Sequence, residues 1–229
     1  MMIKGIKNVF FDLDHTLWDF DKNSYLAFKA VFNELGVCID IENFLEAYRP
    51  VNLKYWKLYR EEKVSKSELR RGRLIDTFNK LNQNIPVKTI DAISDSYIAF
   101  LPDNNYLIQG TVELLEYLNP KYSLHIITNG FEEVQNRKLT ESGIIHFFDT
   151  VTNSEEVGVK KPNPLIFERA LRKSSADLET SIMIGDNYEA DILGAESLGL
   201  QTICFNYHKE KIPLHNIQVS DLIQIKNYI

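Results

Sequence analysis

Two carboxylates, Asp12 and Asp14, stand one residue apart near the start of the chain, directly after a run of large apolar residues. Side chains two positions apart in an extended segment point the same way, so both carboxylates can address one reacting centre. One of them can attack as a nucleophile while the other moves protons. The pair therefore suggests acid/base and covalent chemistry at a single site.

Further polar groups follow later apolar runs. They are Thr128-Asn129-Gly130 and Asp186 with Asp191 five residues on, and a loop supplies Lys160-Lys161-Pro162. Taken singly, each has an ordinary explanation. An Asp or Asn after a strand often caps the next helix, a lysine pair is often a solvated loop, and an Asp in a first helical turn is favoured by the helix dipole. Only their convergence would make a site.

The elements that must position these groups alternate along the chain. Apolar runs predict strands at residues 9–13, 123–128, 148–153, 181–185 and 201–205. Helices are expected over residues 111–119, 132–142 and 189–198, with another beginning near Pro164. Strands separated by helices imply right-handed crossovers. The predicted fold class is therefore α/β, a Rossmann-like parallel sheet with helices on both faces.

A long insertion interrupts this pattern after the first strand. Residues 22–100 contain helical periods and no convincing strand, and Ser65 with Glu68 makes a capping box. Residues 18–107 are therefore predicted to form an inserted all-helical cap, and residues 1–17 with 108–229 the α/β catalytic core. The charges also differ, because the cap holds 13 basic and 13 acidic residues while the remainder holds 13 and 19.

In open α/β sheets, ligands bind outside the carboxyl ends of the strands, near the point where strand order reverses. The polar groups after the predicted strands should meet there. Four carboxylates at one edge would repel and raise one another's pKa unless a cation sat among them. Oxygen ligands favour Mg²⁺, which commonly takes one or two protein carboxylates and leaves positions for water and phosphate. Such a site suits a phosphorylated substrate.

In these residues the sequence resembles the haloacid dehalogenase-like hydrolases, specifically their phosphatases. The motifs occur in the family's order: DxDxT from Asp12 to Thr16, a strand-ending Thr128, a lysine before proline at Lys161, and GDxxxxD from Gly185 to Asp191. Dehalogenases of the same superfamily lack a carboxylate equivalent to Asp14, so its presence favours phosphate. No phosphate-binding loop of a kinase or dinucleotide enzyme follows a strand.

The resemblance implies a role for each carboxylate. Asp12 would be the nucleophile that forms an aspartyl-phosphate. Asp14 would protonate the leaving alcohol and then deprotonate the attacking water. The Asp12 carboxylate, the Asp14 backbone carbonyl and Asp186 would bind Mg²⁺.

The resemblance also assigns the groups around these carboxylates. Thr128 and the Asn129 backbone would hold the transferring phosphoryl oxygens, and Lys161 would offset charge shared by Asp12 and phosphate. Which of Lys160 and Lys161 reaches the site stays open, although the position next to Pro162 matches the motif. Asp191 would orient a ligand or Lys161 from behind the metal ligands.

Three segments resemble a finer branch, the bacterial pyrimidine 5′-nucleotidases with a helical cap: "FFDLDHTLWDF", "IITNGF" and "EEVGVKKPNPLIF". The expected substrate is therefore a nucleoside 5′-monophosphate. Phosphatase action on phosphoglycolate or a sugar phosphate, a phosphomutase, and a non-catalytic phosphate-binding regulator remain alternatives. Aromatic residues near the cap entrance are more often core, and the basic run Arg70, Arg71 and Arg73 is more often a solvated helix face, so neither group is placed in the site.

Composition bounds the partners and the compartment. A net charge of −6 argues against nucleic-acid polymers, whose binding needs clustered Lys and Arg. Cys38 and Cys204 make no zinc-type spacing. No apolar run approaches the roughly 20 residues of a membrane span, and Asp12 comes too early for a signal peptide. The expectation is a cytoplasmic enzyme of a small phosphorylated metabolite, monomeric or homodimeric, without membrane contact.

Overall fold

A computed structural model describes residues 2–229. The chain forms two compact units, which we call the core unit (residues up to Phe20 with Asn105–Ile229) and the helical unit (Asp21–Asn104). The segments that join them belong to the core unit because they pair with each other. Trp18 bridges Leu107, and the Asp19 amide donates to the Tyr106 carbonyl at 3.0 Å.

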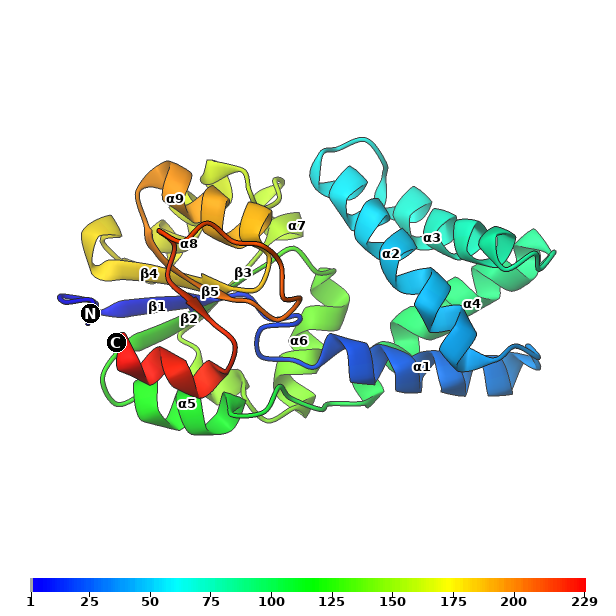
Figure 1. Cartoon of the computed structure of the whole chain (residues 1–229), viewed down its shortest axis with the longest axis horizontal. Helices are drawn as coiled ribbons and strands as arrows, with labels where there is room; N and C mark the ends of the chain where they lie inside the picture. Colours follow the sequence, from blue (N-terminus) through cyan, green and yellow to red (C-terminus); the bar gives the residue numbers. More distant parts are fainter. Residues whose placement is uncertain (1) are drawn as a thin grey trace. The chain divides into compact units, whose positions relative to one another are not determined.

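Six parallel strands form one sheet in the core unit. They are β1 (Asn8–Phe11), β2 (Ser123–Thr128), β3 (Thr150–Asn153), β4 (Ser181–Gly185), β5 (Gln201–Phe205) and β6 (Gln218–Val219), in the order β3-β2-β1-β4-β5-β6 (Figure 1). The chain builds outward from β1 to β3, then returns to β4 on the other side of β1. The switch in strand order therefore lies between β1 and β4.

Helices cover both faces of this sheet, which confirms the α/β prediction. The longer ones are α5 (Thr111–Leu118), α6 (Glu132–Glu141) and α8 (Pro164–Ser174). The shorter ones are η2 (Ile145–Phe147), α7 (Ser154–Val157), η3 (Leu178–Thr180), α9 (Gly194–Leu198) and η5 (Leu222–Asn227). Figure 1 shows α8 and α9 on one face and α5 with η5 on the other. Apolar residues of the central strands fill the space between, with Phe10 and Met183 packed against Ile166 and Phe167 of α8.

Several details differ from the sequence prediction, and the first strand, predicted at residues 9–13, is Asn8–Phe11. The helix expected at residues 189–198 begins as a π-helical turn, η4 (Tyr188–Leu193), and continues as α9. The wider turn brings the Asp191 carboxylate back to the chain after β4, where it accepts from the Asn187 amide at 3.0 Å. The short strand β6 was not predicted, because two residues are too few for a periodic signal.

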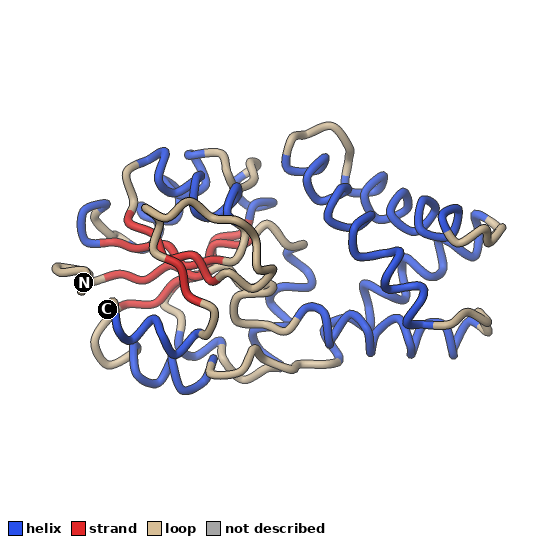
Figure 2. The backbone as a smooth tube through the Cα atoms, viewed as in Figure 1, coloured by secondary structure: helices blue, strands red, loops and turns tan. Residues whose placement is uncertain are grey.

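The helical unit contains no strand in residues 21–104 (Figure 2). Its elements are α1 (Phe20–Leu35), α2 (Ile41–Arg60), α3 (Lys66–Lys80), α4 (Val87–Phe100) and the 3₁₀ turn η1 (Leu101–Asp103). The predicted capping box is present, with both Ser65 and Glu68 bonds formed at the start of α3. None of the helices in residues 2–229 has the length and apolar character that crossing a membrane requires.

Aromatic rings fill the interior of the helical unit. Phe28 of α1 stacks on Tyr97 of α4 at 4.1 Å between ring centroids and meets Phe44 and Tyr48 of α2 at 4.9 and 4.8 Å. Phe44 also contacts Phe78 of α3 at 5.3 Å. Each of the four helices therefore contributes at least one ring to a single cluster.

Candidate active site

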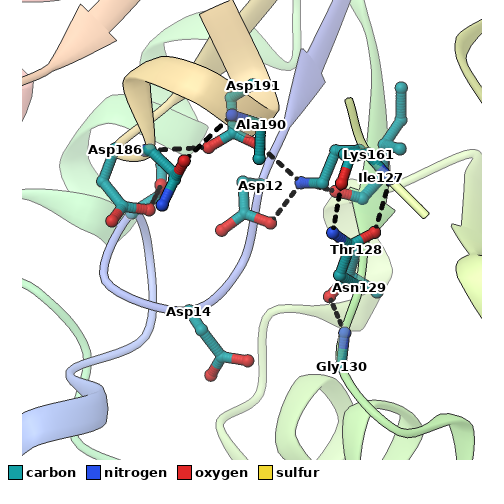
Figure 3. A network of polar contacts seen from close by, with 12 residues as sticks. Asp12, Asp14, Ile127, Thr128, Asn129, Gly130, Lys161, Asp186, Ala190 and Asp191 are labelled. Atoms are coloured by element: carbon teal, nitrogen blue, oxygen red, sulfur yellow. Dashed lines mark hydrogen bonds and ion pairs between the residues drawn. The ribbon is translucent and has the colours of Figure 1, made fainter. Parts of the chain in front are cut away.

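Three carboxylates meet at the carboxyl ends of β1 and β4, on the two sides of the switch point. Asp12 follows β1, Asp186 follows β4, and Asp191 returns from η4. One oxygen of each lies within 4.8 Å of the others, and all three residues are buried. Figure 3 shows these side chains facing a common space. Residues up to 179 positions apart in sequence are thus brought to one point.

Lys161 lies against this group of carboxylates. Its Nζ lies 2.5 Å from Asp12 Oδ1 and 2.7 Å from Asp191 Oδ1, and it donates to the Ile127 carbonyl at 2.7 Å. Only 1% of the residue is exposed. Burial alone would lower the pKa of Lys161, but the Asp12 and Asp191 carboxylates outweigh it and raise that pKa. Lys161 is therefore the lysine of the pair that reaches the carboxylates, and it is charged.

The electrostatics of the group favour a bound cation. Burial raises the pKa of Asp12 well above its usual range, Lys161 opposes that effect, and Asp191 and Asp186 add to it. The pKa of Asp191 is raised for the same first reason, burial. Three carboxylates facing one ammonium leave an excess of negative charge in a buried, all-oxygen donor set. These residues fit a hard divalent ion such as Mg²⁺.

Local sequence explains how Asp191 comes so close to β4. A side chain at Gly185 would collide with the Asp191 carboxylate, so only glycine allows this approach. The Asn187 side chain accepts from the Ala190 amide at 2.9 Å and starts the turn. Asp186 itself accepts from Thr16 Oγ1 at 3.1 Å. In the GDxxxxD motif, the glycine therefore allows the Asp191 carboxylate to pack against the end of β4, while Asp186 lies in the loop that follows β4.

Asp14 lies apart from the three carboxylates and points toward α6 (Figure 3). Lys138 Nζ lies 2.6 Å from Asp14 Oδ1, and Gln135 Nε2 donates to Asp14 Oδ2 at 3.0 Å. Lys138 is 2% exposed, with its ammonium 4.2 Å from the centroid of the Trp18 ring. Both oxygens of Asp14 are therefore held by one face of α6.

Thr128 and Asn129 complete the site from the end of β2. Thr128 Oγ1 accepts from the Gly130 amide at 3.1 Å and from Gln135 Nε2 at 2.7 Å. The Asn129 side chain exchanges two hydrogen bonds with the backbone of Lys161, at 2.8 and 3.0 Å. The Asn129 side chain thus ties the loop that carries Lys161 to the end of β2.

Gln135 and Lys138 were not predicted from the sequence to lie near these residues. A polar pair three residues apart on a helix normally faces solvent, yet these two share the buried face of α6 with Val134 and Leu139. Their position between Val134 and Leu139 on the helix could have indicated that both side chains are buried. Helical periodicity places both between the two apolar residues, on the side that faces the sheet.

Comparisons with known proteins find relatives that match most of the chain. The family model described as haloacid dehalogenase-like hydrolase matches residues 9–205. Pyrimidine 5′-nucleotidase YjjG of Escherichia coli is 34% identical over 206 residues, covering 90% of this chain and 88% of YjjG. A glyceraldehyde 3-phosphate phosphatase of Methanothermobacter thermautotrophicus is 33% identical over 242 residues, covering 98% and 100%. The crystal structure of YfnB from Bacillus subtilis, bound to magnesium, superposes with a TM-score of 0.88 at 25% identity, covering 98% of each chain.

Proposed function

Because this chain belongs to the haloacid dehalogenase-like hydrolases, we propose that it is a phosphatase that hydrolyses nucleoside 5′-monophosphates, pyrimidine ones above all, through a phosphorylated Asp12. The observation that carries the reaction is Lys161, buried between Asp12 and Asp191 beside a third carboxylate. The substrate is supported by the likeness to YjjG and by the segments around Asp12, Thr128 and Lys161.

In the first half of the reaction, a carboxylate oxygen of Asp12 attacks phosphorus. The bond between phosphorus and the 5′ oxygen breaks, and its electron pair stays on that oxygen. Protonated Asp14 donates its proton to the departing oxygen, so the nucleoside leaves neutral. Asp14 must release its contacts with Lys138 or Gln135 to do so, since both of its oxygens are engaged in this structure.

In the second half, water attacks phosphorus of the acyl phosphate. Asp14, now ionised, takes the proton of the water, and the bond between phosphorus and Asp12 breaks to restore the carboxylate. Inorganic phosphate is the product. Splitting one displacement into two lets Asp14 serve as acid and then as base without outside proton donors.

The remaining site residues manage charge. Lys161 would offset the charge of Asp12 and the phosphoryl oxygens, while Thr128 and the Asn129 amide would hold those oxygens in line. The carboxylates of Asp12 and Asp186 with the Asp14 carbonyl would hold Mg²⁺, which when bound supplies positive charge to the phosphoryl oxygens. Asp191 would keep Lys161 in place through their 2.7 Å contact.

The helical unit would serve as the predicted cap, enclosing the small phosphorylated substrate and excluding bulk water. The core unit would then determine the reaction and the cap the substrate. A monomer or a homodimer is compatible with this division, since every proposed site residue comes from one chain.

The test replaces Asp12 by Asn in the full chain with Mg²⁺ present and measures phosphate release from uridine and thymidine 5′-monophosphates. We expect loss of turnover with an unchanged far-ultraviolet circular dichroism spectrum. Asp177→Asn, an exposed Asp of the core unit, is the matched control and should keep its activity. A normal rate for Asp12→Asn would reject the covalent mechanism.

A second candidate is a triose or sugar phosphate phosphatase, favoured by the likeness to the glyceraldehyde 3-phosphate phosphatase. A panel of nucleotides, glyceraldehyde 3-phosphate, hexose phosphates and phosphoglycolate separates the two by kcat/KM. Phosphoryl transfer to a second sugar without phosphate release would identify a phosphomutase instead. Absence of turnover on the whole panel would favour a phosphate-binding regulator.

A further inference from the structure

The loop after β5 brings an imidazole to the candidate active site. β5 pairs with β4 in parallel, with Cys204 beside Gly185, so the chain leaves both strands at the same edge of the sheet. Four residues after Cys204, His208 Nε2 lies 3.3 Å from Asp186 Oδ2. The His208 side chain is 27% exposed and that of Asp186 6%, so a partly exposed imidazole covers a buried carboxylate. His208 belongs to none of the four motifs.

Asp186 is held differently from the other two carboxylates of the site. Those two share the ammonium of Lys161. Asp186 instead accepts from Thr16 Oγ1 on its Oδ1 at 3.1 Å and contacts His208 with its Oδ2. Each oxygen of Asp186 is therefore oriented by a separate side chain, and neither of these side chains is a lysine.

Aromatic rings from two segments of the core unit pack around the His208 imidazole. The centroid of the His15 ring lies 4.8 Å from that of His208, and the centroid of the Tyr207 ring lies 5.0 Å away, both in edge-on contacts. His15 and Tyr207 also contact each other at 5.1 Å. The three rings thus form a closed triangle, and turning His208 away from Asp186 would break two ring contacts.

The backbone on both sides fixes this arrangement. His15 has a φ of 62°, in the left-handed region that residues other than glycine rarely adopt, and its amide donates to the Trp18 carbonyl at 3.0 Å. After β5, the Asn206 side chain exchanges two hydrogen bonds with the backbone of Glu210, at 2.8 and 3.0 Å, and closes the turn that carries His208. A left-handed histidine held beside a site points to a local requirement for its ring.

We propose that His208 is a positioning residue for Asp186 and that it strengthens the binding of Mg²⁺ through this contact. Consecutive residues of the DxDxT motif then orient both Asp186 oxygens, Thr16 directly and His15 through the His208 ring. Replacing a side chain that orients a metal ligand typically costs about ten- to hundredfold in metal affinity. The inference rests on the proposed function for the role of Asp186 as a metal ligand, and it concerns residues of the core unit alone.

The experiment measures Mg²⁺ binding to the full chain, without substrate, from the rise in melting temperature as Mg²⁺ is added. His208→Phe keeps an aromatic ring against His15 and Tyr207 but removes the nitrogen that contacts Asp186. We expect this variant to need about ten- to hundredfold more Mg²⁺ than the wild type for the same rise. His208→Gln, which returns a nitrogen donor, should regain most of the affinity. His215→Phe, at an exposed histidine of the connection between β5 and β6, is the matched control and should respond as the wild type does.

The melting curves in metal-free buffer report whether each variant folds. If His208→Phe gives no cooperative transition, His208→Ala takes its place with the same expectation. An unchanged response to Mg²⁺ would overturn the inference. Tighter binding would also overturn it, because His208 would then compete with the metal for Asp186. A loss that His208→Gln does not restore would do so as well, since ring packing and not the contact with Asp186 would be responsible.

Failure of the proposed function gives a different result, because the melting curves need no turnover. A protein that shows the expected Mg²⁺ responses but hydrolyses none of the monoesters in the panel would contradict the phosphatase proposal and support the role of His208. A wild type whose melting temperature does not respond to Mg²⁺ would overturn the role of His208 together with the proposed metal ligands.

Discussion

The two units treat buried charge in opposite ways. In the core unit, the buried cations Lys161 and Lys138 each touch a carboxylate, at 2.5 and 2.6 Å. In the helical unit, the buried cation Arg73 contacts two phenol rings and an amide. The two ion pairs of the core unit balance part of the negative charge at the candidate site. In the helical unit, neutral groups take the place of a carboxylate beside Arg73.

The largest expected effect is in the core unit. Lys161→Met removes the ammonium between Asp12 and Asp191, so kcat should fall by about a thousandfold, near the upper range for one stabilising group. The fall should be equal for uridine 5′-monophosphate and phenyl phosphate, because the lysine serves the phosphoryl group common to both. Steady-state kinetics of both substrates provide the test, with Lys160→Met as control. A loss on one substrate only would break the division between reaction and recognition.

The next effect is on the stability of the helical unit. Phe28→Ala removes the ring that contacts Phe32, Phe44, Tyr48 and Tyr97, and should cost about 3–5 kcal/mol of unfolding free energy in that unit. Hydrogen exchange followed by mass spectrometry should show faster exchange across residues 21–104. Leu53→Ala, at a side chain that is 51% exposed, should change little. Equal acceleration in β1 and β4 would mean that the units unfold together.

A smaller effect is expected from Lys138, which acts through Asp14. Lys138→Met should lower kcat/KM for uridine 5′-monophosphate by about ten- to hundredfold, part of the usual contribution of a general acid. The value for p-nitrophenyl phosphate should fall less, because its leaving group departs without a proton. Lys138→Arg should restore much of the difference. Identical losses on the two substrates would assign Lys138 a purely structural role.

The smallest effect concerns the two thiols, one in each unit. Burial raises the pKa of Cys204 to about 12, so at pH 8 roughly one thiol in ten thousand is ionised there. Cys38 is exposed in the helical unit. Iodoacetamide should therefore modify Cys38 promptly and Cys204 only after denaturation, as peptide mass spectrometry would report. Comparable rates for both thiols would show that β5 opens readily in the native protein.

Sequence patterns located the strands well wherever a strand is buried on both faces. The runs predicted at 123–128, 181–185 and 201–205 coincide with β2, β4 and β5, because continuous apolar residues are required between two helical layers. The predicted start at Phe148 was two residues early, since Phe148 and Asp149 precede β3. The π-helical turn at Tyr188–Leu193 could not be predicted, because helical periodicity does not reveal one inserted residue.

The polar residues near strand ends were predicted from the sequence, whereas those on α3 and α6 were not. Asp12 and Asp186 were predicted from their places after strands, and Lys161 and Asp191 from the motifs that contain them. The structure brings the four side chains together. Lys138, Gln135 and Arg73 were not placed in any site, because a polar residue on a helix is ordinarily solvated. Their burial depends on neighbours from other elements, such as Trp18 above Lys138 and the rings of α2 and α4 around Arg73.

Residue type and spacing alone determined the α/β fold class, the helical insertion and the identity of the acidic groups at the strand ends. Only the tertiary structure decided which charges are paired: Lys161 with Asp12 and Asp191, Lys138 with Asp14, and Arg73 with no carboxylate among residues 2–229. The physical reason is range. Strand and helix periods act over a few residues, whereas desolvation and ion pairing depend on groups from other elements, up to 149 residues apart for Lys161 and Asp12.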